Sequence, residues 1–578
     1  MEITIQSFEF PGQGCKEREL YYRVSEERSG QESPGSAQRH TYGRETGSDL
    51  SGSVSDNGAH LRLNDGMRIT SDTYMNLFDL DFWSSCTGIS QFSASVIVCG
   101  SGVIRLKKMS SDGNDPVLDL RQGDWKEPER ILFPIRAGYR AGQEENGNGI
   151  LYLEWEASQG GTLMAKDIRY LAEAEPDRLR KVHLSLIICT YHREQELNRN
   201  LKQLKESRFF DEKDELFGKI SARIVDNAGD SQTPGNRKAP AYPADPFRSE
   251  QINCGCLPLI RRYPNPNTGG SGGFLRGMQE TRQDEKKYGI THVLLMDDDV
   301  EFRMESLYRL YAFLCLAKPK YADRTVAGRM FRTDRRSIQF TACEIWNNGL
   351  IRHEGGDLDM KERRNLYGVN RMSGEYTGWW FACFPMEYVR ENLPFPFFLH
   401  CDDVEYGLRK GDRPVVLNGI QVWHETADYR QSPLIAYYDM RNMAIVNTLI
   451  GIRQLKKTLL RVWDRNLLAS LRSRDGNRLA MQLCGIRDYI RWERTGEWPD
   501  GQAKHKEIRA ELEMIAGFSV GARFRYWFRA LLFYLRLRLP GQLIAGSNRF
   551  YKRESGGAGQ HHSSVTDETP GRKAHDIR

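Results

Sequence analysis

Three consecutive aspartates, Asp297–Asp299, follow the apolar run Val293–Met296 and have the spacing of a metal site. Carboxylates placed directly after a buried strand are costly unless a cation meets them. Side chains two residues apart on an extended chain point the same way, so Asp297 and Asp299 can share one cation while Asp298 points elsewhere. Mg²⁺ or Mn²⁺ held there would bridge to diphosphate oxygens. The alternative for three acids alone is a solvated turn.

A glycine-rich segment, Pro266–Gly277, has five glycines within nine positions. Glycines let the backbone approach a ligand closely and adopt dihedral angles that other residues avoid. The segment runs into a predicted helix, whose N-terminus would suit an anion or a cluster of sugar hydroxyls. A flexible linker would not need Asn267 before the glycines or Arg276 after them, so we predict a binding loop around Gly269 and Gly270.

Two acids and a histidine further along the chain are candidates for proton transfer and metal binding. Asp402 and Asp403 follow an aromatic run at the predicted start of a helix. One of them would be a helix N-cap, and the other could be a general base that takes a proton from a hydroxyl. His424 ends the apolar run Val415–Trp423, and as a neutral imidazole it could complete a metal shell. A lone histidine is, however, more often structural.

Two adjacent tryptophans, Trp379 and Trp380, are the remaining candidates for substrate contact. Adjacent tryptophans are usually divided between core and surface. We expect one to pack in the core, and the other could offer an apolar ring face to the C–H face of a sugar.

Apolar runs that end in polar residues indicate the strands that would position these groups. His183–Cys189 has the pattern of a buried parallel strand and is followed by Thr190. A second run ends at Asp226, and a third ends at the three aspartates. Strands alternating with helices favour a doubly wound α/β domain. Ligands of such sheets bind outside the carboxyl ends of the strands, so these polar residues would face one crevice.

The chain divides into four predicted parts. Short strand-like runs separated by turn signals predict an antiparallel β-sandwich over residues 1–180, and the polar stretch 25–66 within it predicts a mobile loop. The α/β domain takes residues 181–430. Apolar residues at spacings of three and four predict a helical region over 431–554. The polar tail 555–578 is predicted to be disordered.

Composition narrows the classes of protein. Hydrophobic residues make up 39% and charged residues 28%, as in ordinary globular proteins, and a net charge of +6 gives no reason to expect a nucleic-acid partner. Several of the 11 cysteines lie in apolar runs, as in a reducing compartment, and Cys254 and Cys256 lack a second pair at zinc spacing. The first residues do not form a signal-peptide pattern, and no stretch reaches roughly 18 apolar residues, so we expect a cytoplasmic protein.

The C-terminal segment 522–539 carries five arginines among apolar and aromatic residues. Such a segment could lie in the interface of an anionic membrane, which would make the protein peripheral on the inner face of the plasma membrane. The alternative is a packed helix whose arginines extend to water. The helical region also offers surfaces for a homo-oligomer.

The motifs occur in the order found in the bacterial galactofuranosyltransferases that polymerise cell-wall galactan. The sequence resembles this family in its aspartate triplet, its glycine-rich segment with an arginine, its tryptophan pair, the block Asp402–Arg409 and a later Trp-His. The resemblance implies an inverting glycosyltransferase of the GT-A fold, with a Rossmann-like α/β domain between a β-rich N-terminal domain and a helical C-terminal region. The motif likeness is strong from about residue 185 to 445 and is one of architecture outside that span.

The resemblance assigns a role to each candidate residue. Asp297 and Asp299 are similar to the metal-binding acids of the family's D-x-D motif, and His424 is similar to the histidine that joins them. Asp403 resembles the catalytic base and Asp402 an acceptor-binding residue. Both tryptophans resemble residues of the acceptor site. The predicted donor contacts, taken from the resemblance and the strand ends together, are Thr190, Arg193, Asp226, Asn267, Gly269, Gly270, Arg276 and Asp298.

The reaction implied by the family moves galactofuranose from UDP-galactofuranose to a galactofuranose-terminated, lipid-linked acceptor, with Mn²⁺ or Mg²⁺ as cofactor. The residues Leu399–Cys401 differ from the Lys-Trp type expected in the mycobacterial polymerases, which bears on acceptor choice. A related transferase with another donor, such as a rhamnosyl nucleotide, would share the same metal and nucleotide residues. A glycan-binding scaffold that acts through its N-terminal sandwich would not need Asp297, Asp299, Asp403 and His424 together.

Overall fold

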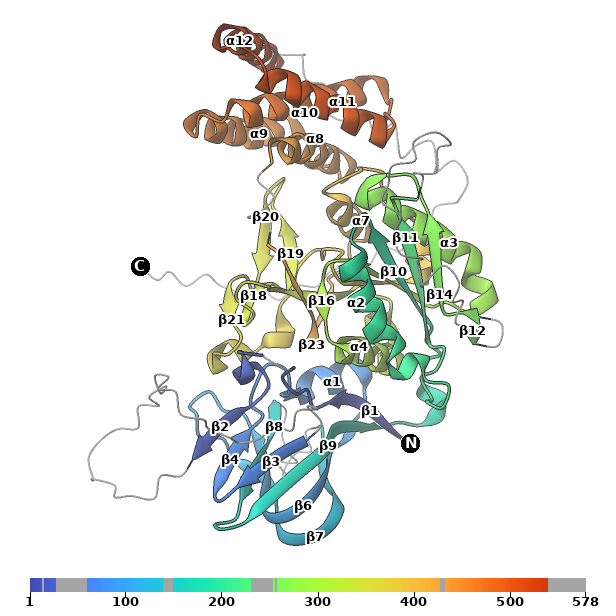
Figure 1. The fold of residues 1–578 in the computed structure, drawn as a ribbon, viewed down its shortest axis with the longest axis vertical. Helices are drawn as coiled ribbons and strands as arrows, with labels where there is room; N and C mark the ends of the chain where they lie inside the picture. Colours follow the sequence, from blue (N-terminus) through green and yellow to red (C-terminus); the bar gives the residue numbers. More distant parts are fainter. Residues whose placement is uncertain are drawn as a thin grey trace, which may run out of the picture.

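The computed structural model describes residues 1–12, 15–26, 60–138, 149–229, 253–254, 257–426 and 432–538. Most of the predicted loop 25–66 and the whole predicted tail 555–578 lie outside these residues, and so does Cys256. Within the described part, an N-terminal group of strands, a central sheet with flanking helices and a group of C-terminal helices follow one another along the long axis (Figure 1).

The N-terminal region is an antiparallel sheet of nine strands in the order β1-β9-β6-β8-β4-β2, with β3 beside β9, β5 beside β8 and β7 beside β6. Hydrogen bonds join all nine into one sheet, so the division into two layers that a sandwich requires stays a prediction. The elements are β1 Glu2–Ser7, β2 Arg23–Glu26, β3 His60–Asn64, β4 Met67–Thr70, β5 Phe78–Asp79, α1 Leu80–Thr87, β6 Gln91–Lys108, β7 Val117–Arg136, β8 Ile150–Ala157 and β9 Thr162–Glu173.

One strand in this sheet differs from its sequence pattern. The runs Ser93–Gly100 and Gly102–Met109 look like two strands in the sequence, yet all their residues except Met109 belong to the single strand β6. The pairing of β6 with β7 shifts register between Val98 and Gly100, and Gly100 has a φ of +102°. The glycine therefore forms a bulge that bends the strand without ending it.

The central sheet has ten strands in the order β14-β11-β10-β15-β22-β17-β18-β21, with β23 beside β17 and β16 beside β23. The first four are parallel, as predicted for an α/β domain, whereas β22 runs antiparallel to both β15 and β17. The strands are β10 Leu184–Thr190, β11 Ile220–Asp226, β14 Ile260–Pro264, β15 His292–Asp297, β16 Glu301–Phe302, β17 Val326–Arg332, β18 Ile338–Thr341, β21 Leu358–Asp359, β22 Ala382–Pro385 and β23 Val415–His424.

Two short hairpins stand beside this sheet, and six helices accompany it. The hairpins are β12 Asn253–Cys254 with β13 Leu257–Pro258, and β19 Cys343–Trp346 with β20 Ile351–Glu354. The helices are α2 Glu194–Lys205, α3 Gly269–Tyr288, α4 Met304–Leu316, α5 Pro319–Ala322, α6 Met386–Glu391 and α7 Asp402–Lys410.

Helix α3 lies unusually close to the central sheet because of two of its glycines. A Cβ at Gly273 would fall 2.1 Å from the sulfur of Cys189, and one at Gly277 would fall 2.3 Å from a side-chain carbon of Ile187. Both neighbours belong to β10. The glycines of the predicted binding loop therefore also bring the helix onto the strand that carries Thr190.

A buried arginine ties the N-terminal sheet to the central one. Arg309 on α4 is 1% exposed, and its guanidinium donates to the carbonyl oxygens of Ser7, Met75 and Asn418. Glu305 accepts from Arg309 and from the backbone amide of Ser7. Because a buried charge is costly without partners, these contacts fix how the two sheets sit together.

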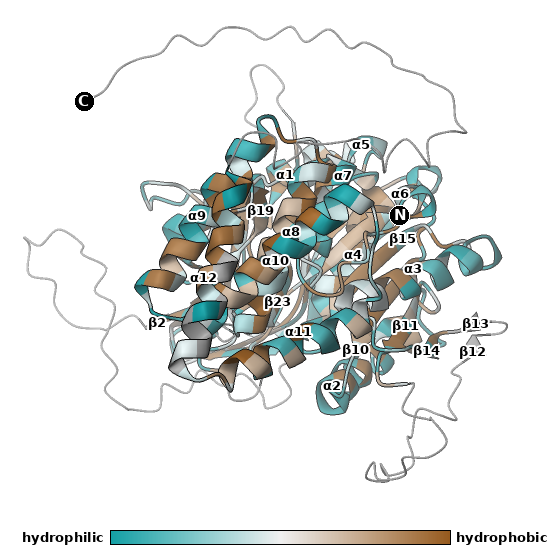
Figure 2. Cartoon of the chain, turned by 90° about the horizontal axis from the view of Figure 1, so that it is seen from above, coloured by the Kyte–Doolittle hydropathy of each residue, from teal (hydrophilic) through white to brown (hydrophobic). Residues whose placement is uncertain are grey.

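The C-terminal helices share an apolar core with residues of the central domain, among them Trp346 on β19 and Val404 on α7. The C-terminal helices are α8 Pro433–Leu449, α9 Leu455–Arg472, α10 Gly476–Thr495, α11 Gly501–Ala516 and α12 Val520–Leu537. Side-chain caps from Ser432, Asp475 and Asp500 satisfy first-turn amides of α8, α10 and α11. Figure 2 shows these helices from above, with apolar segments on α9 and α12. Among the described residues, no helix is long and apolar enough to cross a membrane.

Candidate metal centre and active site

Parallel pairing brings the polar ends of three strands to one edge of the central sheet. Thr190 at the end of β10 pairs with Asp226 on β11, and Cys189 pairs with Asp297 on β15. Several acids gather near the thiol of Cys189. Burial raises the pKa of this thiol, and the negative charges nearby raise it further. Those charges belong to Asp298, Asp297, Asp402 and Asp226.

Two of the three consecutive aspartates and His424 form a cluster with the geometry of a metal site. Nε2 of His424 lies 3.0 Å from Oδ1 of Asp299 and 3.8 Å from Oδ2 of Asp297. One donor atom from each residue lies within 4.8 Å of the others. The short strand β16, which follows the aspartates, pairs with the end of β23, and this pairing brings His424 to them.

The hydrogen bonding of His424 suits metal binding. Its Nδ1 lies 2.7 Å from the carbonyl oxygen of Glu425, and a carbonyl only accepts hydrogen bonds. Nδ1 therefore carries the proton, and the lone pair of a neutral ring at Nε2 faces Asp299. A lone pair and a carboxylate repel each other unless a cation or a proton lies between them, so the residues fit a divalent cation.

The turn that carries the aspartates is held by groups on α2. Arg193, at the N-cap of α2, forms ion pairs with Asp299 and with Asp298, the latter at 3.4 Å. The side-chain amide of Asn200 donates to the carbonyl oxygens of Asp298 and Val300. Asp298 is 6% exposed, and burial raises its pKa to about 6. Its side chain is thus more buried than those of Asp297 and Asp299, and Arg193 supplies positive charge beside Asp299.

Asp226 is held by a residue that the sequence patterns did not single out. Arg262 on β14 donates to Oδ2 of Asp226 from Nε at 3.2 Å and from Nη2 at 2.8 Å. The same Nη2 lies 3.1 Å from Glu194 at the start of α2. The other carboxylate oxygen accepts from the amide of Ala228 at 2.9 Å. Asp226 therefore has a fixed orientation at the strand end.

Buried asparagines fasten the glycine-rich segment to the strand ends. The side chain of Asn227 donates to the carbonyl of Gly269 at 2.9 Å, and Asn265 donates to Oδ1 of Asn227 at 2.8 Å. Asn267, a predicted donor contact, accepts from the amide of Gly269 at 3.1 Å. Gly269 has a φ of +71°, and a Cβ there would fall 2.0 Å from the carbonyl oxygen of Phe398. Only glycine fits this position.

The other two members of the predicted binding loop lie differently. A Cβ at Gly270 would meet no atom within 4 Å, so this position borders open space at the start of α3. Arg276 lies farther along the helix, and its Nε donates to Glu280 at 2.8 Å. The structure therefore places Gly270 at the site and does not bring Arg276 to the metal cluster.

Asp402 and Asp403 lie in the first turn of α7, and a side chain of α3 contacts Asp402. Oδ2 of Asp402 accepts from the hydroxyl of Ser271 at 2.6 Å, and Oδ1 accepts from the amide of Asp403 at 3.1 Å. Oδ1 of Asp403 accepts from the amide of Val404 at 2.8 Å. Ser271 therefore links the glycine-rich helix start to the acid pair.

The turn before the acid pair is strained. Phe398, His400 and Cys401 all have positive φ, at 81°, 64° and 68°, a region that costs a non-glycine residue about 1–3 kcal/mol. Two side chains of α8 hold this turn. Arg441 donates to the carbonyl of Phe397 at 2.8 Å, and Asn442 donates to the carbonyls of Leu399 and His400 at 2.7 and 2.9 Å.

The surroundings of the acid pair raise the proton affinity of both carboxylates. Burial raises the pKa of both carboxyls, and the charges of Asp402 and Glu344 raise that of Asp403 further. Glu344 is buried on β19 and faces His353 on β20, with 2.8 Å between its Oε2 and the histidine Nδ1. A carboxylate with a raised pKa is a stronger proton acceptor than an ordinary aspartate.

The two tryptophans have different environments. Trp379 is 5% exposed and packs edge-on against Phe274 and Tyr406, with ring centroids 5.2 and 5.9 Å apart. Trp380 is half-buried, and its Nε1 donates to the carbonyl of Gly328 at 2.9 Å. Trp379 thus takes the core role expected for one of the pair, and Trp380 is the one that can offer part of a ring face.

Comparison with known proteins identifies similar enzymes, although no family model matches the chain. The chain is 24% identical over 411 residues to galactofuranosyltransferase GlfT2 of Mycobacterium tuberculosis. The matched residues make up 67% of this chain and 59% of that protein. The chain is also 29% identical over 252 residues to GlfT2 of Mycolicibacterium smegmatis, and this match covers 40% of this chain and 36% of that protein. The predicted resemblance to galactofuranosyltransferases is therefore confirmed, although the chain matches less than two thirds of either relative.

A solved structure was also found. It is the mannosyltransferase PcManGT of Pyrobaculum calidifontis in complex with GDP-Man and Mn²⁺, 12% identical, covering 64% of this chain and 91% of its own. The TM-score is 0.29.

The geometry of the cluster predicts that Mn²⁺ binding depends on His424. We expect the substitution His424→Ala to weaken Mn²⁺ binding at least about tenfold, since even residues that only hydrogen-bond to metal ligands contribute about 10–100-fold. Titration calorimetry with the full chain measures it. His353→Ala is the matched control, because that histidine also faces a carboxylate but lies outside the cluster. Equal Mn²⁺ affinity in the two variants would contradict the assignment.

Proposed function

From its similarity to the galactofuranosyltransferases, we propose that the protein is a metal-dependent, inverting glycosyltransferase. In this proposal it moves galactofuranose from UDP-galactofuranose to a hydroxyl of a galactan or other cell-surface glycan, which is carried on a lipid. The observation that supports it best is the convergence of two acidic groups at the end of β10. Asp297 and Asp299 form one group with His424, and Asp402 and Asp403 form the other, which Ser271 contacts.

The two groups divide the chemistry between them. When bound, a divalent cation supplies positive charge to the diphosphate leaving group. Arg193 adds a guanidinium beside Asp298 and Asp299, where it can face the same phosphates. The strand end with Thr190 and Asp226, and the open start of α3 at Gly270, supply the walls against which the nucleotide would lie.

Asp403 is the base of the proposed reaction. It takes the proton of an acceptor hydroxyl, whose oxygen forms the new bond to the anomeric carbon as the bond to the diphosphate breaks. UDP leaves, and one displacement inverts the anomeric centre. Asp402, held by Ser271, and the half-buried Trp380 are the residues that would orient the acceptor. Holding the two substrates in line accounts for much of the rate in this scheme.

The donor set favours Mn²⁺ over Mg²⁺ as the proposed cofactor. Mg²⁺ prefers oxygen ligands and keeps several waters, whereas imidazole nitrogen is a better ligand for transition metals. The cluster offers two carboxylates and the Nε2 of His424.

A panel of donors tests the proposed function. Purified full-length protein would be supplied with a synthetic galactofuranosyl acceptor and with UDP-galactofuranose, UDP-galactopyranose, UDP-glucose or dTDP-rhamnose, each with Mn²⁺ or with EDTA. We expect transfer from UDP-galactofuranose alone, and we expect EDTA to abolish it. Transfer from dTDP-rhamnose in its place would overturn the donor assignment, and the EDTA arm would still test the requirement for a metal.

The role of Asp403 predicts a large loss of rate without a loss of binding. We expect Asp403→Asn to lower kcat about 10²–10⁴-fold while UDP affinity stays within twofold. In the unaltered protein, activity should fall as the pH drops through the raised pKa of Asp403, because the base becomes protonated. This fall should occur at a higher pH than the pKa of an ordinary aspartate would give. Asp439→Asn is the control, since Asp439 pairs with His400 close by. Wild-type kcat in Asp403→Asn would contradict the role.

A further inference from the structure

A buried tyrosine beside the acid pair has a hydroxyl that lacks a partner. Tyr376 lies in the segment before the tryptophan pair and is 1% exposed. Its hydroxyl oxygen is shielded from solvent, and it makes no hydrogen bond with any residue in the part of the chain that the structure describes. Burying a hydroxyl without a hydrogen bond is costly, so an unpaired hydroxyl at such a place calls for a physical reason.

Tyr376 is held between the β19–β20 hairpin and α7. The amide of Glu344 donates to the carbonyl of Tyr376 at 2.9 Å, and the amide of Tyr376 donates to the carbonyl of Glu344 at 3.2 Å. On the other side, a Cβ at Gly407 of α7 would fall 2.5 Å from the Cβ of Tyr376, so the helix lies directly on the tyrosine. The ring also belongs to the same apolar cluster as Val404. Its position is therefore fixed from both sides.

The face of α7 that rests on Tyr376 also carries Asp403. Asp403 and Gly407 are four residues apart, and such positions lie above one another on a helix, about 5–6 Å from each other. Burial raises the pKa of the Tyr376 phenol, and the charge of Asp403 raises it further, ahead of every other charge nearby. The phenol therefore lies beside the proposed base and keeps its proton, so it can act as a hydrogen-bond donor.

Each of the other two carboxylates near the phenol already has a partner. Oε2 of Glu344 lies 2.8 Å from Nδ1 of His353, and Oε2 of Glu375 accepts from a backbone amide at 2.9 Å. Oδ1 of Asp403 accepts from a backbone amide of α7 at 2.8 Å, whereas its Oδ2 accepts no hydrogen bond from the described residues. The carboxylate of Asp403 is therefore the acceptor that is left for the phenol.

The other groups around Asp403 and the phenol are mostly acidic. The charged and titratable side chains that act on them or on their immediate neighbours are Cys401 and Asp402 at the start of α7, His400 in the turn before it, Glu344 on β19, Glu375 beside Tyr376, and Asp439 on α8. Asp439 pairs with His400 at 2.8 Å. An ionised Asp403 thus has negative neighbours, and a hydrogen-bond donor beside it would stabilise its charged form.

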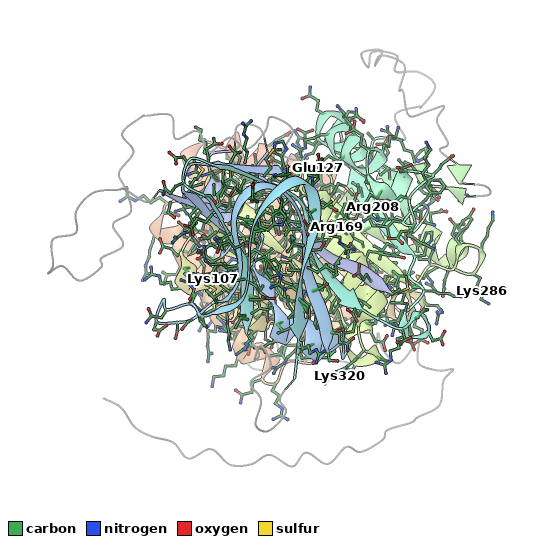
Figure 3. All side chains as sticks on the ribbon, turned by 90° about the horizontal axis from the view of Figure 1, so that it is seen from below. Lys107, Glu127, Arg169, Arg208, Lys286 and Lys320 are labelled. Carbon is green, nitrogen blue, oxygen red and sulfur yellow. The ribbon has the colours of Figure 1, made fainter. Side chains whose placement is uncertain are left out.

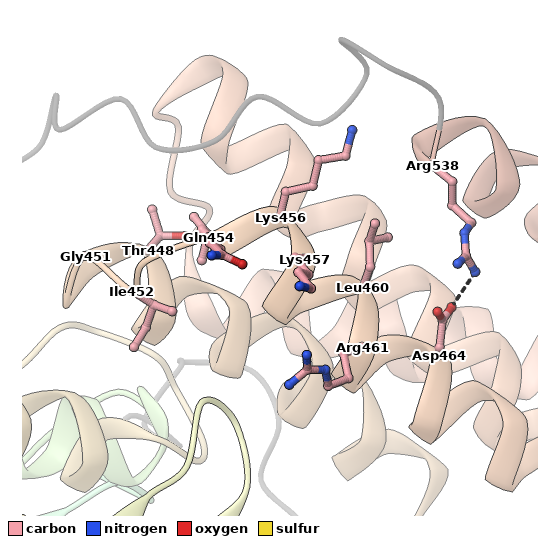
Figure 4. Close-up of a pocket in the computed structure, with 11 residues that line it drawn as sticks. Thr448, Gly451, Ile452, Gln454, Lys456, Lys457, Leu460, Arg461, Asp464 and Arg538 are labelled. Atoms are coloured by element: carbon pink, nitrogen blue, oxygen red, sulfur yellow. Dashed lines mark hydrogen bonds and ion pairs between the residues drawn. The ribbon is translucent and has the colours of Figure 1, made fainter.

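The open cavity beside α9 does not border the phenol. This cavity of about 910 Å³ is lined by Thr448 of α8, by residues of α9 such as Lys456 and Arg461, and by Arg538 (Figure 4). Neither Tyr376 nor the acid pair lines it. A molecule bound in that cavity would not supply the missing partner, which leaves the acid pair as its source.

We propose that Tyr376 is a positioning residue for the base and that its hydroxyl donates a hydrogen bond to the carboxylate of Asp403 when that carboxylate is ionised. The inference rests on the proposed function for the part that Asp403 plays in sugar transfer. The hydrogen bond would favour the charged form of Asp403 and hold the carboxylate in one orientation towards the acceptor hydroxyl. When Asp403 takes the acceptor's proton, its charge is lost and the hydrogen bond weakens, while the phenol keeps its own proton throughout.

Titration of the Asp403 carboxyl in the full chain tests the inference without any substrate. Aspartate labelled with carbon-13 at the side-chain carboxyl would be incorporated, and the Asp403 signal would be identified by its loss in Asp403→Asn. We expect Tyr376→Phe to raise the pKa of Asp403 by about one pH unit, since a hydrogen bond to a charged group is worth about a factor of ten. The thermal midpoint should not fall, because the variant keeps the ring and removes a hydroxyl that has no partner in this structure.

The same variant should show a loss of transfer that depends on pH. Below the pKa of Asp403, kcat should fall about tenfold in Tyr376→Phe, because less of the base is ionised. At high pH, kcat should return to within twofold of the unaltered chain, because the base is then ionised in both proteins. UDP affinity should stay the same, since Tyr376 is not part of the metal cluster. A merely structural role would lower activity alike at every pH.

Tyr170→Phe is the matched control. Tyr170 is 4% exposed, its hydroxyl also lacks a partner among the described residues, and its ring stacks on Phe78 in the N-terminal sheet. Figure 3 shows this sheet from below, with the neighbouring residue Arg169 labelled. The control should leave the titration of Asp403 and the pH dependence of kcat unchanged.

The two measurements separate this inference from the proposed function. A titration of Asp403 that is the same in Tyr376→Phe and in the unaltered chain would overturn the inference, whether or not the protein transfers sugar. Equal changes in Tyr376→Phe and Tyr170→Phe would overturn it as well. A raised pKa in Tyr376→Phe alone, in a protein that transfers sugar from no donor, would support the hydrogen bond and overturn the proposed function instead.

Discussion

The negative charge gathered at the carboxyl ends of the parallel strands is the constraint on which the rest of the site depends. Four carboxylates raise the pKa of Cys189 near the end of β10, namely those of Asp226, Asp297, Asp298 and Asp402. Each carboxylate is costly to bury and is stabilised by a different neighbour. Arg262 holds Asp226, Arg193 reaches the aspartates after β15, and Ser271 holds Asp402. The remaining demand for positive charge falls on the face that Asp297, Asp299 and His424 share.

Much of the surrounding architecture serves to hold these acids close together in fixed positions. Glycines let α3 lie on β10 and let its first turn meet the turn before α7. That turn is strained at three residues, and side chains of α8 hold it from the other side. The acid pair is therefore positioned by two helices that are far apart in the sequence. Strain at such a place is tolerated because the surrounding contacts determine it.

The sequence could predict the groups whose chemistry is visible in their spacing. The aspartate triplet, the polar ends of β10, β11 and β15, and the glycine-rich start of α3 all appear where their patterns indicated, because apolar runs and glycines report local structure. The pairing of β16 with β23, which brings His424 to Asp299, joins segments that are far apart in the sequence. The position of His424 at the end of an apolar run suggested a role in a metal site, and the resemblance to a known family paired it with Asp297 and Asp299.

The residues that sequence reasoning missed are single polar side chains whose partners are distant. Arg262, Asn200 and Asn227 carry no local pattern, and each is defined by contacts made only in the folded chain. The antiparallel strand β22 in the middle of the sheet was missed because its short apolar run resembles any buried segment. Arg276 pairs with Glu280 one turn along the same helix, so its predicted contact with the donor stays a prediction.

The dependence of nucleotide binding on the metal tests the central claim most directly, namely that the acids at the strand ends hold a cation that receives the diphosphate. UDP would be titrated into the full chain by calorimetry, once with Mn²⁺ and once with EDTA. We expect UDP to bind at least about tenfold more tightly with Mn²⁺, and Asp299→Asn to remove the difference. UDP that binds equally well in EDTA would show that the acids do not act through a metal, and it would contradict the account.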